Sequence, residues 1–366
     1  MKLKWIFSFA LIMAMVGCSE EPEIPGEEPE IPEGKYTTVT DENYALAETQ
    51  IIFKNYRDRI IAQSVDSVDS VDSVSSVCSG TGTLLHNRYC SDPKDTTVMR
   101  INFDTRYSMC LLDLNCDATL TMPETNGRYQ SAWFVTEEHY NPMAINEPGT
   151  YTITQEDMGS RYVFVMIRTQ VNMRDEADMA IVTELQNQIQ VTQEDKGSYQ
   201  PNEVWNNDEV WAMRQKYLNI ANEKHYTSDQ LFGKKGTLTQ EQHNCGVAYG
   251  WGGFTSDQAV YLSRIPENDK PCTLTLKDVP VADNAFWSIT IYDAQGYPQG
   301  DPYNVNSAFA EANPDGSYTI HFGGDDKNAT NYLEIFPGWT YILRLYLPQE
   351  PYFNGTWVHP ELEYED

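Results

Sequence analysis

The stretch YSMCLLDLNCDATLTMP, residues 107–123, decides the fold class of this chain. It contains two short apolar runs separated by the turn-forming Asn115 and Asp117, and residues 119–122 alternate polar with apolar side chains. Such alternation is typical of a half-buried β-strand. No helical segment separates the two runs, so they favour an antiparallel sandwich or barrel over a parallel sheet.

Comparable runs surround this stretch and return near the C-terminus. The runs on the N-terminal side are MRINF, YQSAWFV, TYTITQ and RYVFVMIRT, and those on the C-terminal side are CTLTLKDVP, FWSITIYDAQG, SYTIHFGG and WTYILRLYLP. Strong turn signals at residues 293–296 (DAQG) and 313–316 (NPDG) divide the later runs. We therefore expect a mainly β protein with two antiparallel, jelly-roll-like β-sandwich domains.

Three segments show helical rather than strand periodicity: residues 40–61, 176–191 and 207–224. Their apolar positions are Leu46, Ile52, Phe53, Tyr56 and Ile60 in the first, Ala177, Ile181, Leu185 and Ile189 in the second, and Val210, Met213, Tyr217 and Ala221 in the third. These positions predict an N-terminal helix and two helices that bridge the β domains, with apolar faces that belong to the core.

The first 17 residues are typical of a secretory signal peptide, because two lysines precede an apolar run that is too short to span a bilayer. The following Cys18 completes a sequence, MVGC, that resembles the bacterial lipobox. We therefore expect Cys18 to be acylated and to anchor the protein in a membrane. Ser19 replaces the aspartate that retains lipoproteins in the inner membrane, which indicates the outer membrane of the cell envelope. Residues 19–21 also resemble the surface-export signal of Bacteroidota lipoproteins, and surface exposure stays an open alternative.

Two segments have compositions that cannot form a packed core. Residues 18–38 repeat EEPEIP and predict an extended acidic, proline-rich tether. Residues 64–76 repeat a Ser-Val-Asp triplet whose period suits neither helix nor strand, which predicts a flexible insertion. The formal charge of the chain is −29 and becomes about −31 when the signal leaves with its two lysines, which argues strongly against nucleic acid and anionic lipid as partners.

Six cysteines remain once Cys18 is assigned to lipid. An even number in an oxidising compartment favours disulfides, and pairing of neighbours predicts the bridges Cys78–Cys90, Cys110–Cys116 and Cys245–Cys272. Six free thiols are the alternative. The chain contains no CxxC motif, so we expect no metal site, and nothing in the sequence indicates another cofactor.

Longer motifs point to a family. The segments at 107–135 and 163–191 resemble the bacterial domain of unknown function 1254, including Asp113, Gly127-Arg128-Tyr129, Arg168 and Asp178. FWSITIYD, DGSYTI and LRLYLP, in that order, resemble its usual tandem partner, domain of unknown function 1214. The resemblance covers nearly all residues from 40 onward and implies a two-domain architecture rather than a mechanism.

The chain departs from the family pattern at two segments, so its ligand would differ from that of typical members if either lines a site. Residues 303–307 (YNVNS) stand where the family usually has Asn-Arg-Tyr-Ser, and residues 331–334 (NYLE) where it has Asn-Trp-Leu-Pro. We expect an N-terminal β domain at 39–200, a helical linker at 201–245 and a C-terminal β-sandwich at 246–366.

The motifs of zinc proteases, α/β-hydrolases and P-loop nucleotide-cleaving enzymes are absent from the sequence. Arginines within apolar strands must pair with a carboxylate of the protein or of a ligand, and aromatic side chains offer stacking faces for sugars. The ligand-binding candidates on these grounds are Asp113, Arg128, Tyr129, Arg168, Trp287, Tyr292 and Arg344.

Three functions fit these features. The first is a membrane-anchored lipoprotein that binds a carbohydrate or another polar ligand, anionic ligands included, in a cleft between the β domains. The second is a hydrolase or lyase that acts on such a ligand with Asp, Arg and Tyr groups. A cluster of Asp113, Arg128 and Arg168 that opens on a deep pocket would favour this second function. The third is a structural or protein-binding surface lipoprotein. The oligomeric state stays open.

Overall fold

The computed structural model describes residues 36–66, 78–89, 93–94 and 100–364. The predicted signal peptide, Cys18 and nearly all of the acidic tether lie outside the described residues. So do most of the predicted insertion and Cys90, and with Cys90 the predicted Cys78–Cys90 disulfide. No helix of the described ranges is long and apolar enough to cross a membrane.

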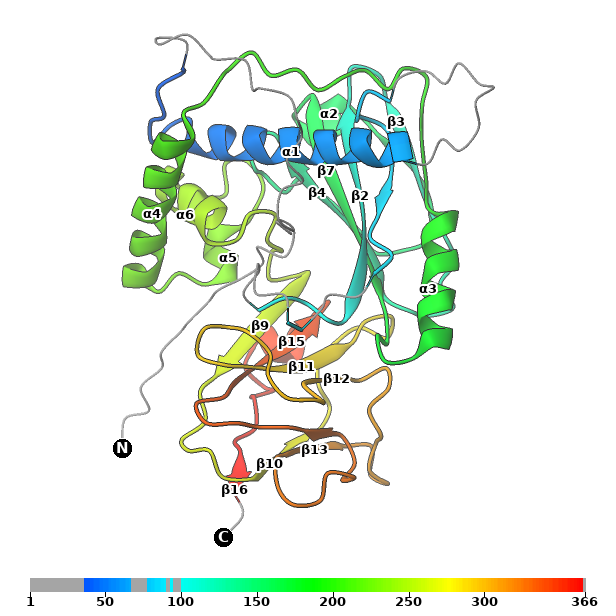
Figure 1. The fold of residues 1–366 in the computed structure, drawn as a ribbon, viewed down its shortest axis with the longest axis vertical. Coiled ribbons are helices and arrows are strands. Elements are labelled where there is room, and N and C mark those ends of the chain that lie inside the picture. The colour runs from blue at the N-terminus through cyan, green and yellow to red at the C-terminus, as the bar shows by residue number, and fades with distance from the viewer. Residues whose placement is uncertain (1–35, 67–77, 90–92, 95–99, 365–366) are drawn as a thin grey trace.

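The fold is mainly β, as predicted, and its N-terminal part is a two-layer sandwich (Figure 1). The larger sheet consists of β1 (Leu85–His86), β2 (Thr105–Asp113), β7 (Tyr162–Gln170), β4 (Gln130–Thr136) and β5 (Ala144–Ile145), in this order. The smaller sheet consists of β6 (Gly149–Ile153), β3 (Ala118–Met122) and β8 (Gln190–Gln193). One apolar core fills the space between the two sheets.

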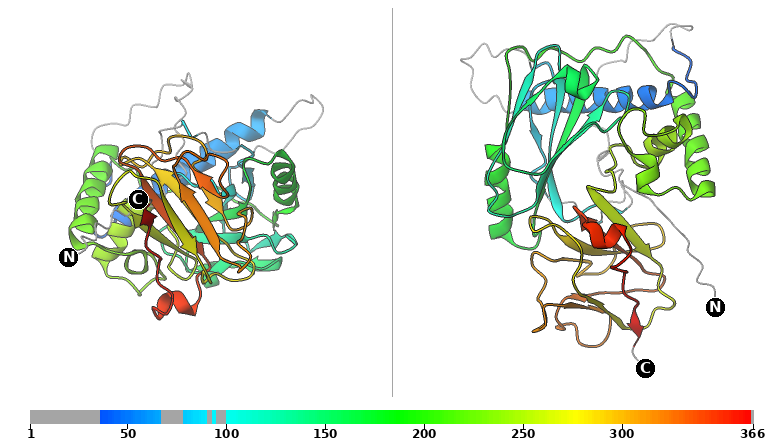
Figure 2. Two further views of the ribbon diagram at one scale, coloured as in Figure 1. Left: turned by 90° about the horizontal axis from the view of Figure 1, so that it is seen from below. Right: turned by 180° about the vertical axis from the view of Figure 1, so that it is seen from behind.

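Helices cover the other face of the larger sheet, so that β2, β4 and β7 are buried throughout. These helices are α1 (Tyr44–Asp66), α4 (Asn207–Lys224), α5 (Ser228–Leu231) and α6 (Gln240–Gly250). The short α2 (Gln155–Met158) follows β6 and precedes β7 in the chain. Figure 2 shows α1 running across the sheet, with α4, α5 and α6 to one side. The helices within the predicted linker therefore pack into a shared core.

The helix α3 (Glu176–Gln188) forms where it was predicted but buries a partly different face. Val182 and Leu185 lie at the centre of the buried face, whereas Ile181 is 53% exposed. The reason is a tertiary contact: Gln186 donates hydrogen bonds from Nε2 to the Tyr107 carbonyl and to Ser108 Oγ on β2. This polar attachment rotates the helix away from the orientation that its apolar residues alone favour.

The C-terminal part is a sandwich of two four-stranded sheets. The sheet nearer the N-terminal part consists of β12 (Asn304–Asn306), β11 (Trp287–Tyr292), β15 (Thr340–Tyr346) and β9 (Ala259–Arg264). The outer sheet consists of β14 (Tyr332–Leu333), β13 (Tyr318–Phe322), β10 (Cys272–Leu276) and β16 (Glu363–Tyr364), and α7 (Glu350–Phe353) follows β15 in the chain. All pairings are antiparallel except that of β13 with β14.

The two sandwiches share a continuous apolar core where they meet. Phe286 and Tyr346 of the C-terminal sandwich stack with ring centroids 4.2 Å apart, and Tyr129 of the N-terminal sandwich packs against both rings. Stacked and edge-on aromatic contacts of this kind add to the free energy gained by burial. The junction is therefore a packed interface.

The predictions of the Cys110–Cys116 and Cys245–Cys272 disulfides are wrong. Cys110, Cys116 and Cys245 are free thiols. Cys110 points from β2 into the core between the N-terminal sheets, whereas Cys116 lies in the loop beyond the end of that strand. Cys245 belongs to α6, and Cys272 belongs to the separate core of the C-terminal sandwich. Neighbours in sequence thus lie in different parts of the fold.

Candidate functional site

The inner sheet of the C-terminal sandwich turns a polar face toward the N-terminal sandwich. Strand alternation sends one set of its side chains into the apolar core and the other set into the junction. We name the polar members of this second set, together with Asp104 of the N-terminal sandwich, the interface layer: Asp104, Ser288, Thr290, Asn304, Asn306 and Arg344. All six residues are buried, so their polar groups depend on partners inside the protein.

Asp104 is the centre of the interface layer. Its Oδ1 accepts hydrogen bonds from Nδ2 of Asn304 and Nδ2 of Asn306, each at 3.1 Å. Gln170, at the end of β7, donates to Asn306 Oδ1 at 3.5 Å. The second carboxylate oxygen of Asp104 and Ser288 Oγ are buried without a hydrogen-bond partner among the described residues. The layer thus joins the two sandwiches while it keeps unused hydrogen-bonding capacity.

Arg344 fastens the other side of the layer. Its guanidinium donates to Thr290 Oγ1 at 3.0 Å, to Tyr292 Oη at 2.7 Å and to the carbonyl of Arg100 at 3.2 Å. Tyr292 in turn donates to the carbonyl of Ile101 at 2.7 Å. Both candidate residues therefore hold the segment before β2 against the C-terminal sandwich, which is a structural role.

Two adjoining cavities open at the edge of this layer, and we name them together the junction pocket. The larger lobe has a volume of about 380 Å³ and is lined by Asn126, Gly127, Arg128, Gln170, Asn172, Asp175, Asp178, Ala308 and Phe309. The smaller lobe has a volume of about 220 Å³ and is lined by Pro93, Phe103, Asn172, Met173, Arg174, Tyr303, Asn304 and Phe309. Asn172 and Phe309 line both lobes, and each lobe is lined by residues of both sandwiches.

Arg128 forms the rigid wall of the larger lobe. Its guanidinium forms an ion pair with both carboxylate oxygens of Asp178 on α3 and donates to the carbonyl of Gln170 at 2.9 Å. Asp178 also accepts a hydrogen bond from the backbone nitrogen of Asn172 at 2.7 Å. Because both side chains are largely buried, this bidentate pair fixes the geometry of the wall.

Asp175 lies at the rim of the same lobe, where α3 begins. Its Oδ1 accepts a hydrogen bond from the backbone nitrogen of Ala177 at 2.9 Å and so caps the helix. Within the described residues, the hydrogen bond of Asp175 with Ala177 involves only this one carboxylate oxygen. In the smaller lobe, Arg174 forms an ion pair with Asp301 and lies over the Tyr303 ring at 5.2 Å. The pocket therefore combines hydrogen-bonding groups with aromatic surface.

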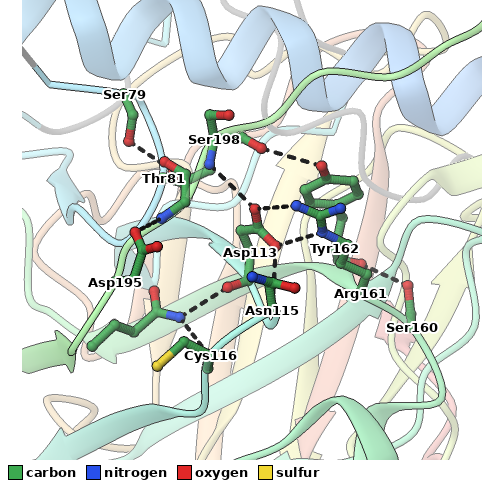
Figure 3. Close-up of polar contacts among 12 residues, drawn as sticks. Ser79, Thr81, Asp113, Asn115, Cys116, Ser160, Arg161, Tyr162, Asp195 and Ser198 are labelled. Atoms are coloured by element: carbon green, nitrogen blue, oxygen red, sulfur yellow. Dashed lines mark hydrogen bonds and ion pairs between the residues drawn. The ribbon is translucent and has the colours of Figure 1, made fainter.

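Asp113 lies far from the junction pocket. It is the last residue of β2, whose first residue, Thr105, pairs with Gln170, so eight residues of strand separate it from the pocket by about 27 Å. Arg161 donates to both of its carboxylate oxygens, at 2.7 and 2.9 Å, as Figure 3 shows. The structure therefore does not bring Asp113 together with Arg128 and Arg168.

The contacts of Asp113 show that its carboxylate stabilises the turn that follows β2. It also accepts hydrogen bonds from the backbone nitrogens of Asn115 and Ser198 (Figure 3). Burial opposes the charged form, but these donors and Arg161 keep the pKa of Asp113 below its usual value. A Cβ on Gly197 would lie 2.2 Å from Asp113 Oδ2, and Gly197 has a φ of +60°, so only glycine fits there.

The aromatic candidates do not form an exposed stacking surface. Trp287 is buried in the core of the C-terminal sandwich against Tyr318, and Tyr292 is buried beneath Arg344. Tyr129 is buried in the junction and donates from Oη to Ser131 Oγ at 2.9 Å. None of the three lines the junction pocket. The aromatic surface of the pocket comes instead from Phe103, Tyr303 and Phe309.

Of the seven candidates, Arg128 alone lines the junction pocket. Several residues that line the pocket were not predicted from the sequence. They include Asn172 and Asp175, which follow β7, and Tyr303 and Asn304 of the C-terminal sandwich. A signal for the last two was present, because YNVNS is a segment in which the chain departs from the family pattern. Asn304 and Asn306 also alternate with a buried valine, which indicates a buried polar strand face.

Comparisons with known proteins bear on the fold. Residues 81–193 match the model of a protein of unknown function, DUF1254, and residues 266–350 match that of a second, DUF1214. No curated protein matches the chain.

Two solved structures resemble this fold. The VPA0106 protein from Vibrio parahaemolyticus is 16% identical with a TM-score of 0.57, over 88% of this chain and 100% of that one. A putative uncharacterized protein from Burkholderia cenocepacia is 13% identical with a TM-score of 0.48, over 88% of this chain and 98% of that one.

Proposed function

From the premise that this chain belongs to the family that carries DUF1254 and DUF1214 in tandem, we propose that it is a ligand-binding envelope lipoprotein. Its ligand is a carbohydrate or a similar polyhydroxylated molecule, held in the junction pocket. The observation that supports this proposal is the lining of the pocket, where amide, carboxylate and guanidinium groups of the N-terminal sandwich lie opposite Tyr303, Asn304 and Phe309 of the C-terminal sandwich.

This lining suits hydroxyl groups better than an extended apolar ligand. The Asn172 amide can donate and accept hydrogen bonds and the Asp175 carboxylate can accept two, which suits the vicinal hydroxyls of a sugar. Phe309 and Tyr303 offer flat apolar surface for the faces of a ring. The larger lobe, at about 380 Å³, falls within the size range of small-molecule sites, which often lie at domain interfaces.

Replacing Asp175 by serine is expected to weaken ligand binding at least tenfold without unfolding the protein. Serine preserves the helix cap but removes the second carboxylate oxygen of this pocket-lining residue, and a hydrogen bond to a charged group is worth about 1.5–3 kcal/mol. We would first identify ligands by their effect on the melting temperature in a library of neutral and acidic oligosaccharides. Isothermal titration of both proteins then measures the loss.

The matched control is Asp195→Ser, because Asp195 also accepts a local backbone hydrogen bond, from Gly197, but lies outside the pocket. Binding that survives in the Asp175 variant would contradict the proposed site. Mass spectrometry of each mixture tests the enzyme alternative, since a hydrolase or lyase would change the ligand. A library without any stabilising compound would favour the structural or protein-binding alternative.

The lipoprotein part of the proposal depends on Cys18 and the signal before it. Cells grown with a labelled fatty acid are expected to incorporate the label into the wild type and not into Cys18→Ala, because acylation requires this thiol. Cys116→Ala, which removes a partly exposed thiol elsewhere, is the control. Label that persists in the Cys18 variant would exclude an N-terminal acyl anchor. Fractionation of the same cells tests the outer-membrane location.

A further inference from the structure

Arg168 is a buried guanidinium with unused hydrogen-bond donors. Only 1% of the residue is exposed, and neither of its terminal nitrogens has a hydrogen-bond partner among the described residues. Its guanidinium carbon lies 3.8 Å from the centroid of the Phe254 ring and 5.3 Å from that of Tyr107. Aromatic rings thus flank the positive charge, and the Tyr107 hydroxyl lies near enough to the guanidinium to favour its charged form without meeting the geometry of a hydrogen bond.

The charge of Arg168 meets no carboxylate in the described part of the chain, since none of the ion pairs there includes it. Burial opposes the charged form of Arg168, but its pKa still lies above its usual value, so the group is charged. Burial raises the pKa of Tyr129 to about 12 and moves that of Tyr261 in the same direction. These two phenols are therefore neutral and leave the charge uncompensated.

Arg344 is a second buried arginine, with a structural role, and its hydrogen bonds can be compared with those of Arg168. It is as deeply buried as Arg168, yet its guanidinium donates to a hydroxyl, a phenol and a carbonyl. An unpaired buried charge is costly, and native proteins compensate it with an opposite charge. The contrast between the two arginines indicates that the partner of Arg168 is not among the described residues.

We propose that a small anion of the size of a halide, nitrate or formate binds to the terminal nitrogens of Arg168 inside the junction. Tyr107 is placed to assist, because its Oη accepts a hydrogen bond from Asn102 Nδ2 at 3.2 Å and keeps its own proton for the anion. Arg168 lines neither lobe of the junction pocket, so this anion site is separate from the proposed ligand site and goes beyond the proposed function. The enclosure by aromatic rings limits the anion to a few atoms.

The test is thermal unfolding of the full protein in gluconate salts, with chloride, nitrate or formate introduced at constant ionic strength. Gluconate is too large for the enclosed site, so a fitting anion is expected to raise the melting temperature saturably, by roughly 4 °C at 100 times its dissociation constant. Crystals soaked in bromide are expected to show an anomalous peak within hydrogen-bonding distance of Arg168 Nη1 or Nη2.

Variants connect the effect to the site. Arg168→Met is expected to abolish the dependence on the anion, whereas Arg161→Met, which alters a surface arginine, is expected to keep it. If the Arg168 variant does not fold, Tyr107→Phe removes one donor to the anion and is expected to raise the concentration needed for half of the shift about tenfold. Any of three results would overturn the proposal: a wild-type melting temperature that does not change with the anion, a shift in melting temperature that persists in Arg168→Met, or a bromide peak only at other sites.

Discussion

Replacing Asp104 by alanine is expected to lower the free energy of unfolding by about 4 kcal/mol. The change leaves the amide groups of Asn304 and Asn306 buried without an acceptor, at about 1–3 kcal/mol each. It also removes a carboxylate charge that favours the charged form of the buried Arg344 from beyond ion-pair distance. These contributions overlap, so they do not add in full. Urea unfolding followed by tryptophan fluorescence measures the loss.

The matched control for this prediction is Asp301→Ala. Asp301 also forms an ion pair, with Arg174, but its side chain is 79% exposed, so its loss is expected to cost less than about 1 kcal/mol. A second variant, Asp104→Asn, keeps an acceptor for the two asparagines and separates the hydrogen bonds from the charge. A loss for Asp104→Ala as small as that of the control would show that the interface layer does not hold the sandwiches together.

Acidification is expected to destabilise the wild type through His359, by about 3 kcal/mol across the window from pH 6.5 to pH 4. Burial first, and the positive charge of Arg264 second, lower the pKa of His359 to about 4. In the unfolded chain the ring takes up its proton near pH 6.5, so the unfolded state binds more protons throughout this window. The stability is therefore complete above pH 6.5 and is lost as the pH falls toward 4, at about 1.4 kcal/mol per pH unit.

The measurement compares the wild type with His359→Gln at pH 7 and at pH 4. The difference in unfolding free energy between the two proteins is expected to shrink by about 3 kcal/mol. This comparison cancels other groups, among them Glu48 and Glu137, whose pKa values burial raises and which act with the opposite sign. Tyr341→Phe removes the hydroxyl beside His359 and leaves the imidazole, so it is expected to keep the pH dependence. Parallel curves for the wild type and the His359 variant would exclude His359 as the cause.

A second buried histidine is expected to act in the same direction. His139 Nε2 accepts a hydrogen bond from the backbone nitrogen of Gly252 at 2.9 Å, which a protonated ring cannot do. Burial, and secondly the nearby His243, lower the pKa of His139. The acid sensitivity of the wild type therefore has more than one source, which is why the variant and not the wild type alone tests His359.

The kinds of element were predictable because short-range periodicity determines them. Alternation identified the strands around residues 107–123, and a spacing near 3.6 identified α1, α3 and α4 within a few residues of their ends. The helix α6 has no counterpart among the predictions, although Thr239 and Gln242 form a capping box at its start. Its buried face includes His243, Asn244 and Gly246, and so lacks a continuous apolar stripe.

The sequence by itself determined the β-sandwich class and the tandem family, because these depend on local patterns and motifs. Of its seven candidate site residues, only Arg128 lines the junction pocket. Only the tertiary structure decided which charged residues meet. Arg128 forms an ion pair with Asp178, and Asp113 forms one with Arg161 at the far end of its strand, whereas Arg168 has no ion-pair partner within the part of the chain that the structure describes. The physical reason is that charge pairing and burial depend on distances between segments far apart in the chain, and these follow from sheet order and from the packing of the two sandwiches.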